Sequence, residues 1–207
     1  MELQTISKII IQAQEAFLIV KFLCEEETDP DTHYEKHMNA FFRYSRIVYW
    51  QLTVIELSKL FLSRQTERFN LITFLNKLRP GGLFQKFKIS NEKIDGWQNR
   101  ISAQTDDIEN LKQQRDKVYV HTDSDNEGVA NEVSLEKAEN LLRIAKEVVK
   151  EINLTCFQTS YIFTPVGSPS ENLKSCINNL TIAKKVKMEG YRRVAKKYGL
   201  EDELPDN

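Results

Sequence analysis

Apolar residues recur every three or four positions along most of this chain, which is the pattern of amphipathic α-helices. One stretch, residues 33–63, is apolar on nearly every side, and we expect it to form a central helix covered by its neighbours. Ser134 has the side chain and the position of an N-cap. The helices predicted from the pattern cover residues 2–24, 33–63, 69–78, 91–121, 134–152 and 171–199.

Glycine and proline fall at only a few places, and the long stretches between them favour long helices over many short strands. No pair of alternating β-runs is present. We therefore predict an all-α fold, an antiparallel helix bundle over residues 1–163, followed by a linker and a basic helical extension over residues 164–207.

A seven-residue repeat marks the segment 91–121. Ile94, Ile101 and Ile108 share one heptad position, and the same position next falls on Arg115. A guanidinium on a buried seam is costly unless it is paired or faces a polar cavity. The seam also suggests a homodimer, because two copies of the motif that follows would meet across it.

Composition excludes several classes of protein. The net charge of −1 gives no bulk attraction to nucleic acid or membranes, and no segment has the roughly 18 apolar residues of a membrane span. Cys24, Cys156 and Cys176 have no CxxC spacing and indicate reduced, mostly buried thiols of a cytoplasmic protein. The N-terminus lacks the pattern of a signal peptide.

Polar residues with catalytic potential cluster where the seam ends, in the sequence RDKVYVHTD. They are Arg115, Asp116, Lys117, Tyr119, His121 and Asp123. On an ideal helix, six residues advance roughly 9 Å and turn the side chains about 120° apart. Arg115 and His121 would therefore converge only at a distorted helix end or across a two-fold interface. The same residues also fit an ion-pair cluster that only caps the helix.

Two further groups deserve comparison with their structural alternatives. His33 and His37 have a spacing that suits one metal ion, but no third ligand is evident, so a solvated helix face is the preferred interpretation and neither a metal nor a cofactor is predicted. The C-terminal extension carries seven cations between residues 184 and 199 against one acid, Glu189. Lys184, Lys185, Arg192 and Arg193 are the residues we expect to contact RNA phosphates, although such a run is also typical of a solvated face.

The motif resembles the signature of HEPN domains, in which an arginine is followed by a polar residue and, after four to six positions, by a histidine. The wording RDKVYVHTD is most similar to the abortive-infection branch, the one named for the AbiU system. Upstream segments resembling Gln51–Leu62 (QLTVIELSKLFL) and Phe69–Leu78 (FNLITFLNKL) also recur in that branch, so the resemblance covers roughly residues 30–155.

The resemblance implies a helix bundle that dimerises so that two motifs line one cleft. It assigns transition-state charge stabilisation to Arg115, general acid or base chemistry to His121, and their orientation to Asp116. Lys117 would hold a phosphate, and Tyr119 would stack on a base or donate its hydroxyl. Some HEPN toxins carry a modified tyrosine two residues after the histidine, where this chain has Asp123, so that mode of silencing is not expected.

The function implied is a metal-independent endoribonuclease that serves in phage defence by abortive infection or in a toxin–antitoxin system. Its expected partners are a second copy of the chain, an RNA substrate and a protein antitoxin or regulator. The alternative is a non-catalytic HEPN module that dimerises and binds RNA or a protein partner.

Overall fold

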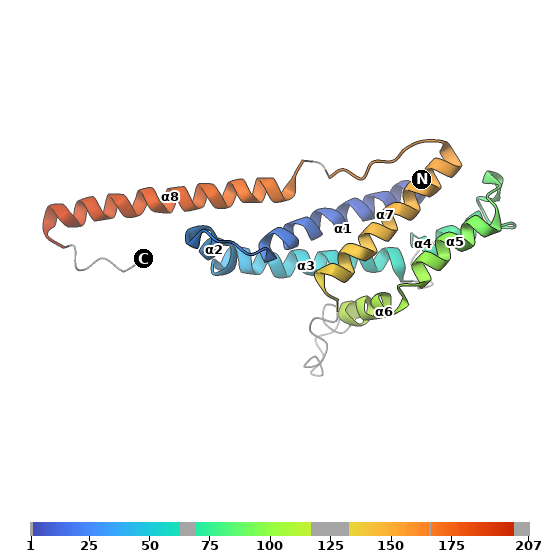
Figure 1. Cartoon of the computed structure of the whole chain (residues 1–207), viewed down its shortest axis with the longest axis horizontal. Helices are drawn as coiled ribbons and strands as arrows, with labels where there is room; N and C mark the ends of the chain where they lie inside the picture. Colours follow the sequence, from blue (N-terminus) through green and yellow to red (C-terminus); the bar gives the residue numbers. More distant parts are fainter. Residues whose placement is uncertain (1, 63–68, 117–132, 166, 201–207) are drawn as a thin grey trace.

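The computed structural model of the chain describes residues 2–62, 69–116, 133–165 and 167–200 (Figure 1). These residues form helices and connecting loops without any β-strand, which confirms the predicted all-α bundle. The α-helices are α1 (Glu2–Cys24), α2 (Pro30–His37), α3 (Ala40–Phe61), α4 (Leu71–Leu78), α5 (Asn91–Ser102), α6 (Thr105–Gln113), α7 (Leu135–Phe157) and α8 (Pro169–Tyr198).

The main core lies where α1, α3 and α7 pack together, with α1 and α3 side by side and antiparallel (Figure 1). Helices α4 and α5 close one end of this core. Its largest buried side chains include Ile6, Ile10, Leu57, Leu60, Leu71, Leu75, Leu78, Ile94, Trp97 and Leu111. For most helices, the apolar side chains that recur along the sequence therefore pack against other helices of the same chain.

The predicted helix over residues 33–63 is two helices. Asp29 caps α2, and its Oδ2 accepts a hydrogen bond from the Thr32 amide at 2.9 Å. Asn39 has an extended backbone and caps α3 in the same way, with its Oδ1 2.9 Å from the Phe41 amide nitrogen. The second cap restarts the helix at Ala40, which apolar periodicity alone does not reveal.

The predicted helix over residues 91–121 is also interrupted. Helix α5 ends at Ser102, and Gln104 leaves helical geometry before α6 begins at Thr105. The seam residues Ile94 and Ile101 are nevertheless buried in the main core of the same chain, and Ile108 is partly buried against it. The expectation that this seam forms a dimer interface is therefore wrong, because α1, α3, α4 and α7 already cover the core to which it contributes.

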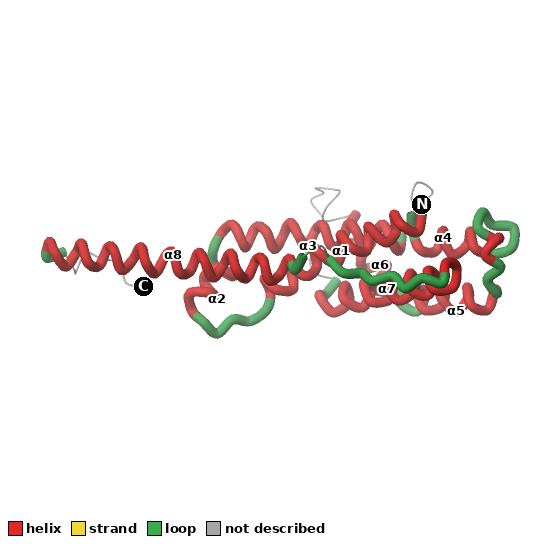
Figure 2. The backbone as a smooth tube through the Cα atoms, turned by 90° about the horizontal axis from the view of Figure 1, so that it is seen from above, coloured by secondary structure: helices red, strands yellow, loops and turns green. Residues whose placement is uncertain are grey.

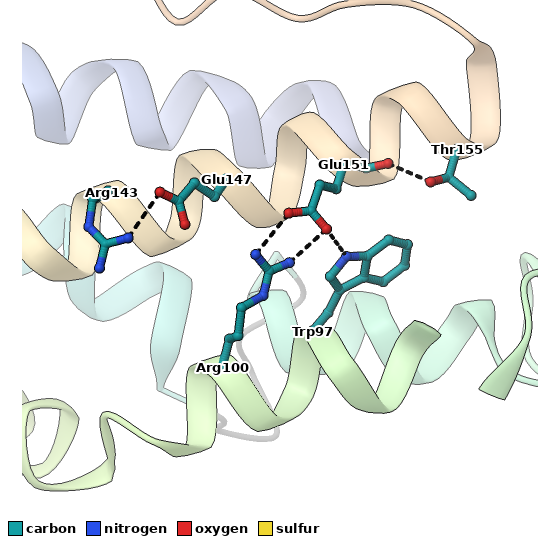
Figure 3. A network of polar contacts seen from close by, with 6 residues as sticks. All are labelled: Trp97, Arg100, Arg143, Glu147, Glu151 and Thr155. Atoms are coloured by element: carbon teal, nitrogen blue, oxygen red, sulfur yellow. Dashed lines mark hydrogen bonds and ion pairs between the residues drawn. The ribbon is translucent and has the colours of Figure 1, made fainter. Parts of the chain in front are cut away.

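Helix α5 is bound to α7 by a polar network centred on Glu151 (Figure 3). Arg100 donates to both carboxylate oxygens at 2.8 Å, and the indole nitrogen of Trp97 donates to Oε2 at 2.7 Å. The hydrogen bonds from Arg100, the largest influence, lower the pKa of Glu151 from its ordinary value. This network orients the segment that leads into α6 and Arg115.

The first half of α3 is not covered on all sides, contrary to the expectation from its sequence. Phe41 and Tyr44 are 67% and 68% exposed, and Ile47 is 55% exposed. Only the opposite side of this half, which includes Phe42, packs against other helices. An apolar surface thus remains open along α3.

Helix α8 crosses from the bundle into solvent (Figures 1 and 2). Ile177, in its first half, is buried with Leu23 of α1 and Phe42 of α3, whereas its second half extends past the rest of the molecule. None of the described helices combines the length and the apolar character that a bilayer crossing requires. The division of the chain at residue 163 stays a prediction.

Candidate functional site

Arg115 and Asp116 lie in a π-helical turn, residues 114–116, that continues α6. The side chain of Arg115 is 9% exposed, and Asp116 Oδ1 lies 2.8 Å from both Nε and Nη2 of its guanidinium. In a regular α-helix, side chains of adjacent residues do not face each other, so the length of the arginine side chain is what allows this contact. Of the two conditions under which a buried seam tolerates a charge, the structure shows pairing. Single π turns within α-helices frequently occur at functional sites.

The rest of the motif cannot be placed beside this pair. Lys117, Tyr119, His121 and Asp123 lie outside the described residues, so the roles expected for them stay predictions. What the structure describes is the first half of the motif: a guanidinium largely withdrawn from water and bound to the carboxylate of the next residue. Such a pair holds the guanidinium in a fixed orientation.

Two of the basic residues expected to bind RNA have carboxylate partners within the chain. Lys184 forms an ion pair with Glu35, a residue only 1% exposed, and Lys185 Nζ lies 2.8 Å from Asp31 Oδ2. The hydrogen bond with Asp31 raises the pKa of Lys185. Both lysines therefore bind α8 to α2. Ion pairing within the chain is thus a sufficient reason for a lysine at these two positions, with or without RNA.

Beyond Lys185, the second half of α8 carries five further cations. We call Lys187, Arg192, Arg193, Lys196 and Lys197 the basic face of α8; all five are exposed. The side chain of Arg193 is 84% exposed and lies 3.9 Å from Glu189, a weak contact. RNA binding by Arg192 and Arg193 stays a prediction.

Sequence reasoning missed two tyrosines on this half of α8. Tyr191 and Tyr198 are 49% and 65% exposed, and a lysine ammonium lies 5.5 Å and 5.6 Å from the respective ring centroids. Their seven-residue separation, about 10.5 Å along a helix, is the signal that could have found them. Exposed aromatic rings among cations are typical of surfaces on which bases stack.

Histidines and cysteines offer little chemistry in the described part of the chain. The rings of His33 and His37 lie 4.6 Å apart, and burial, followed by neighbouring cations, lowers the pKa of His37. Among the described residues, no group of three or more metal-ligating side chains comes together. Cys24 and Cys176 are exposed, which corrects the expectation of mostly buried thiols.

Two hollows lie elsewhere on the described surface. One, of about 380 Å³, lies between α1, α3 and the start of α8 and includes Glu15 and Glu56; the other, of about 460 Å³, lies beside Trp97 and Arg100. Neither is lined by Arg115 or Asp116. The candidate site is therefore the motif itself and not one of these hollows.

Comparison with protein-family models, with curated proteins and with solved structures yields no match. The resemblance to HEPN domains rests on the residues of the motif and stays a prediction.

Proposed function

We propose that the protein is a metal-independent endoribonuclease of HEPN type that acts in phage defence by abortive infection or in a toxin–antitoxin system. The observation that carries this proposal is the sequence RDKVYVH at the end of α6, with its arginine buried and bound to the adjacent aspartate. An arginine oriented in this way suits a site where negative charge develops on a phosphate.

The reaction would use the neighbouring hydroxyl of the RNA. The 2′-oxygen attacks phosphorus, the bond to the 5′-oxygen breaks, and the products are a 2′,3′-cyclic phosphate and a free 5′-hydroxyl. The proton leaves the 2′-hydroxyl and a proton reaches the departing oxygen, and His121 performs one of these transfers. Arg115 stabilises the charge on the equatorial oxygens, and Asp116 orients Arg115.

Substrate contacts beyond the reacting phosphate fall to Lys117, Tyr119 and the basic face of α8. The fixed charge of Arg192 and Arg193 suits phosphate, and both residues stand on the half of the helix that projects from the bundle. A homodimer would supply a second copy of the motif to the same cleft, and a protein antitoxin or regulator would restrain it.

The proposal is tested by incubating the purified protein with structured RNA in EDTA. We expect cleavage that leaves 2′,3′-cyclic phosphate ends, and a loss of about 10²-fold or more in His121→Ala, because general acid–base catalysis contributes that much. Arg115→Lys keeps a cation at the buried site but loses the planar guanidinium, and it should be similarly impaired. Lys112→Ala, on the exposed surface of α6, is the control. Cleavage that EDTA abolishes, or that survives both site variants, contradicts the proposal.

The burial of the Arg115–Asp116 pair also supports a second candidate, a non-catalytic module that dimerises and binds RNA or a protein. In this reading the pair only stabilises the helix end. Arg115→Ala would then lower thermal stability or dimerisation, and the wild-type protein would bind RNA without cutting it under any condition.

A further inference from the structure

One face of α3 carries a row of apolar side chains that stay partly or largely exposed in the described chain. It consists of Phe41, Tyr44, Val48, Leu52 and Ile55, here called the α3 stripe. Phe41, Tyr44, Val48 and Leu52 are 67%, 68%, 37% and 38% exposed, and Ile55 is half-buried. Successive members are three or four residues apart, so they form a single line along the helix.

The composition of this face points to a protein partner and not to nucleic acid. Neither the stripe nor Ile47 and Gln51 beside it contributes a charge, and the two arginines of this half of α3, Arg43 and Arg46, belong to other sides of the helix. A phosphate backbone would find no cation on the stripe. A seam of large apolar residues at intervals of three and four is the surface that a second helix packs against.

The spacing within the stripe is symmetric about its centre. From Phe41 the intervals are three, four, four and three residues, so Val48 is the midpoint. When the α3 helix of a second copy is placed antiparallel about a two-fold axis at Val48, every residue of the stripe therefore lies opposite a residue of the other stripe. Phe41 then lies opposite Ile55 of the second copy, and Tyr44 opposite Leu52, so that each aromatic ring meets a smaller aliphatic side chain.

The area of the surface is consistent with this arrangement. With Ile47, the exposed parts of these side chains amount to roughly 500 Å² per copy, at the size where an apolar patch on a monomer becomes functional. Two copies would bury about 1,000 Å² in total, near the lower limit for a specific interface. In the described chain, Phe41 and Tyr44 at one end of the stripe remain the most exposed of its members.

We propose that the α3 stripe is a homodimer interface in which two α3 helices pack antiparallel, with Val48 of each copy meeting Val48 of the other at the two-fold axis. This interface differs from the one first expected at the seam of α5 and α6. It can form whether or not the protein cleaves RNA, so its test is independent of the nuclease function.

Residue 48 provides a direct test, since a residue on a two-fold axis faces its own copy. Light scattering coupled to size exclusion, at about 100 µM chain, should give twice the chain mass of 24.2 kDa for the wild type. Val48→Glu and Val48→Lys each place like charges together and should be monomeric. Mixing these two variants should restore the dimer, as one carboxylate then faces one ammonium.

Control variants test whether a loss of the dimer comes from the position of the substitution and not from unfolding. Val186→Glu and Val186→Lys make the same changes at a side chain 63% exposed on α8, and they should leave the mass unchanged. Circular dichroism should show wild-type helicity for all four variants. In a background with Cys24 and Cys176 changed to serine, Val48→Cys should form an intermolecular disulfide on mild oxidation, whereas Arg43→Cys, on another side of α3, should not.

Each outcome decides the proposal. A wild-type monomer, or dimers unchanged by Val48→Glu and Val48→Lys, would overturn it. If the mixture of Val48→Glu and Val48→Lys stays monomeric, the two-fold axis does not pass through Val48. Wild-type protein that is monomeric alone but dimerises when RNA is added would also count against a contact between two α3 helices, which requires no nucleic acid.

Discussion

Asp116 Oδ1 lies 2.8 Å from Arg115 Nε, and the two residues share one π-helical turn at the end of α6. Removing the carboxylate in Asp116→Ala takes a charge-assisted hydrogen bond from a guanidinium that is largely buried. We expect the free energy of unfolding to fall by about 1–3 kcal/mol, measured by urea denaturation. Asp116→Asn keeps an acceptor and should cost less. Equal stability of Asp116→Ala and wild type would show that the aspartate does not hold the arginine.

The same aspartate variants distinguish orientation from stability in catalysis. If Asp116 positions Arg115, Asp116→Asn should lower the cleavage rate by more than its loss of stability explains, at a temperature where the variant is fully folded. The measurement is the single-turnover rate on a saturating RNA substrate. An unchanged rate would leave Asp116 a purely structural residue.

Lys184 and Glu35 join α8 to α2. Glu35 is 1% exposed, so Lys184→Ala would leave a buried carboxylate with its hydrogen bond from Asn39 Nδ2, 2.6 Å away, but without its cation. We expect a loss of about 1–3 kcal/mol and faster hydrogen exchange in the first half of α8. Lys187→Ala, where the ammonium lies over Tyr191, is the matched control and should change neither quantity. Unaltered exchange in Lys184→Ala would mean that apolar contacts around Ile177 hold α8 by themselves.

Cations of α8 that form an ion pair with α2 should contribute less to RNA affinity than those on the projecting half. Arg193 and Lys196 are exposed on the projecting half, whereas Lys185 is 2.8 Å from Asp31. The slope of log affinity against log salt should fall by about 0.7 for each of Arg193→Gln and Lys196→Gln on single-stranded RNA. Lys185→Gln should change it less. Equal effects of all three substitutions would contradict this division.

The fold class could be predicted from the sequence, because apolar periodicity and the scarcity of glycine and proline act locally. Helix ends were harder to predict. Asn39 and Gln104 interrupt segments whose apolar pattern continues across them, and an N-cap such as Asn39 is only one side chain within that pattern. The all-round apolar character of α3 predicted burial, but burial depends on which neighbours exist, and Phe41 and Tyr44 remain 67% and 68% exposed in the described chain.

The candidate site was predicted in part. The heptad count placed Arg115 on a buried position that demands a partner, and the structure supplies Asp116. The contacts of Lys184 and Lys185 could not be predicted, since Glu35 and Asp31 are about 150 residues away in the chain and only tertiary packing brings them close. A run of cations in a sequence does not reveal which of them already have carboxylate partners.

Glu151 should make part of the stability depend on pH. Its pKa is lowered in the folded protein, chiefly by hydrogen bonds from Arg100, so the ionised form is favoured by folding. The stabilisation is therefore complete above the ordinary pKa of 4.5 and is lost as the pH falls through the lower pKa of the folded state.

Glu151→Gln should lower Tm by about 2–4 °C at pH 7, a value reduced for the partial exposure of the pair, and the difference from wild type should shrink near pH 3. Glu147→Gln removes an exposed pair with Arg143 within α7 and serves as the control, with little change at either pH (Figure 3). A Tm difference for Glu151→Gln that stays constant from pH 7 to pH 3 would show that the carboxylate charge does not stabilise the contact between α5 and α7.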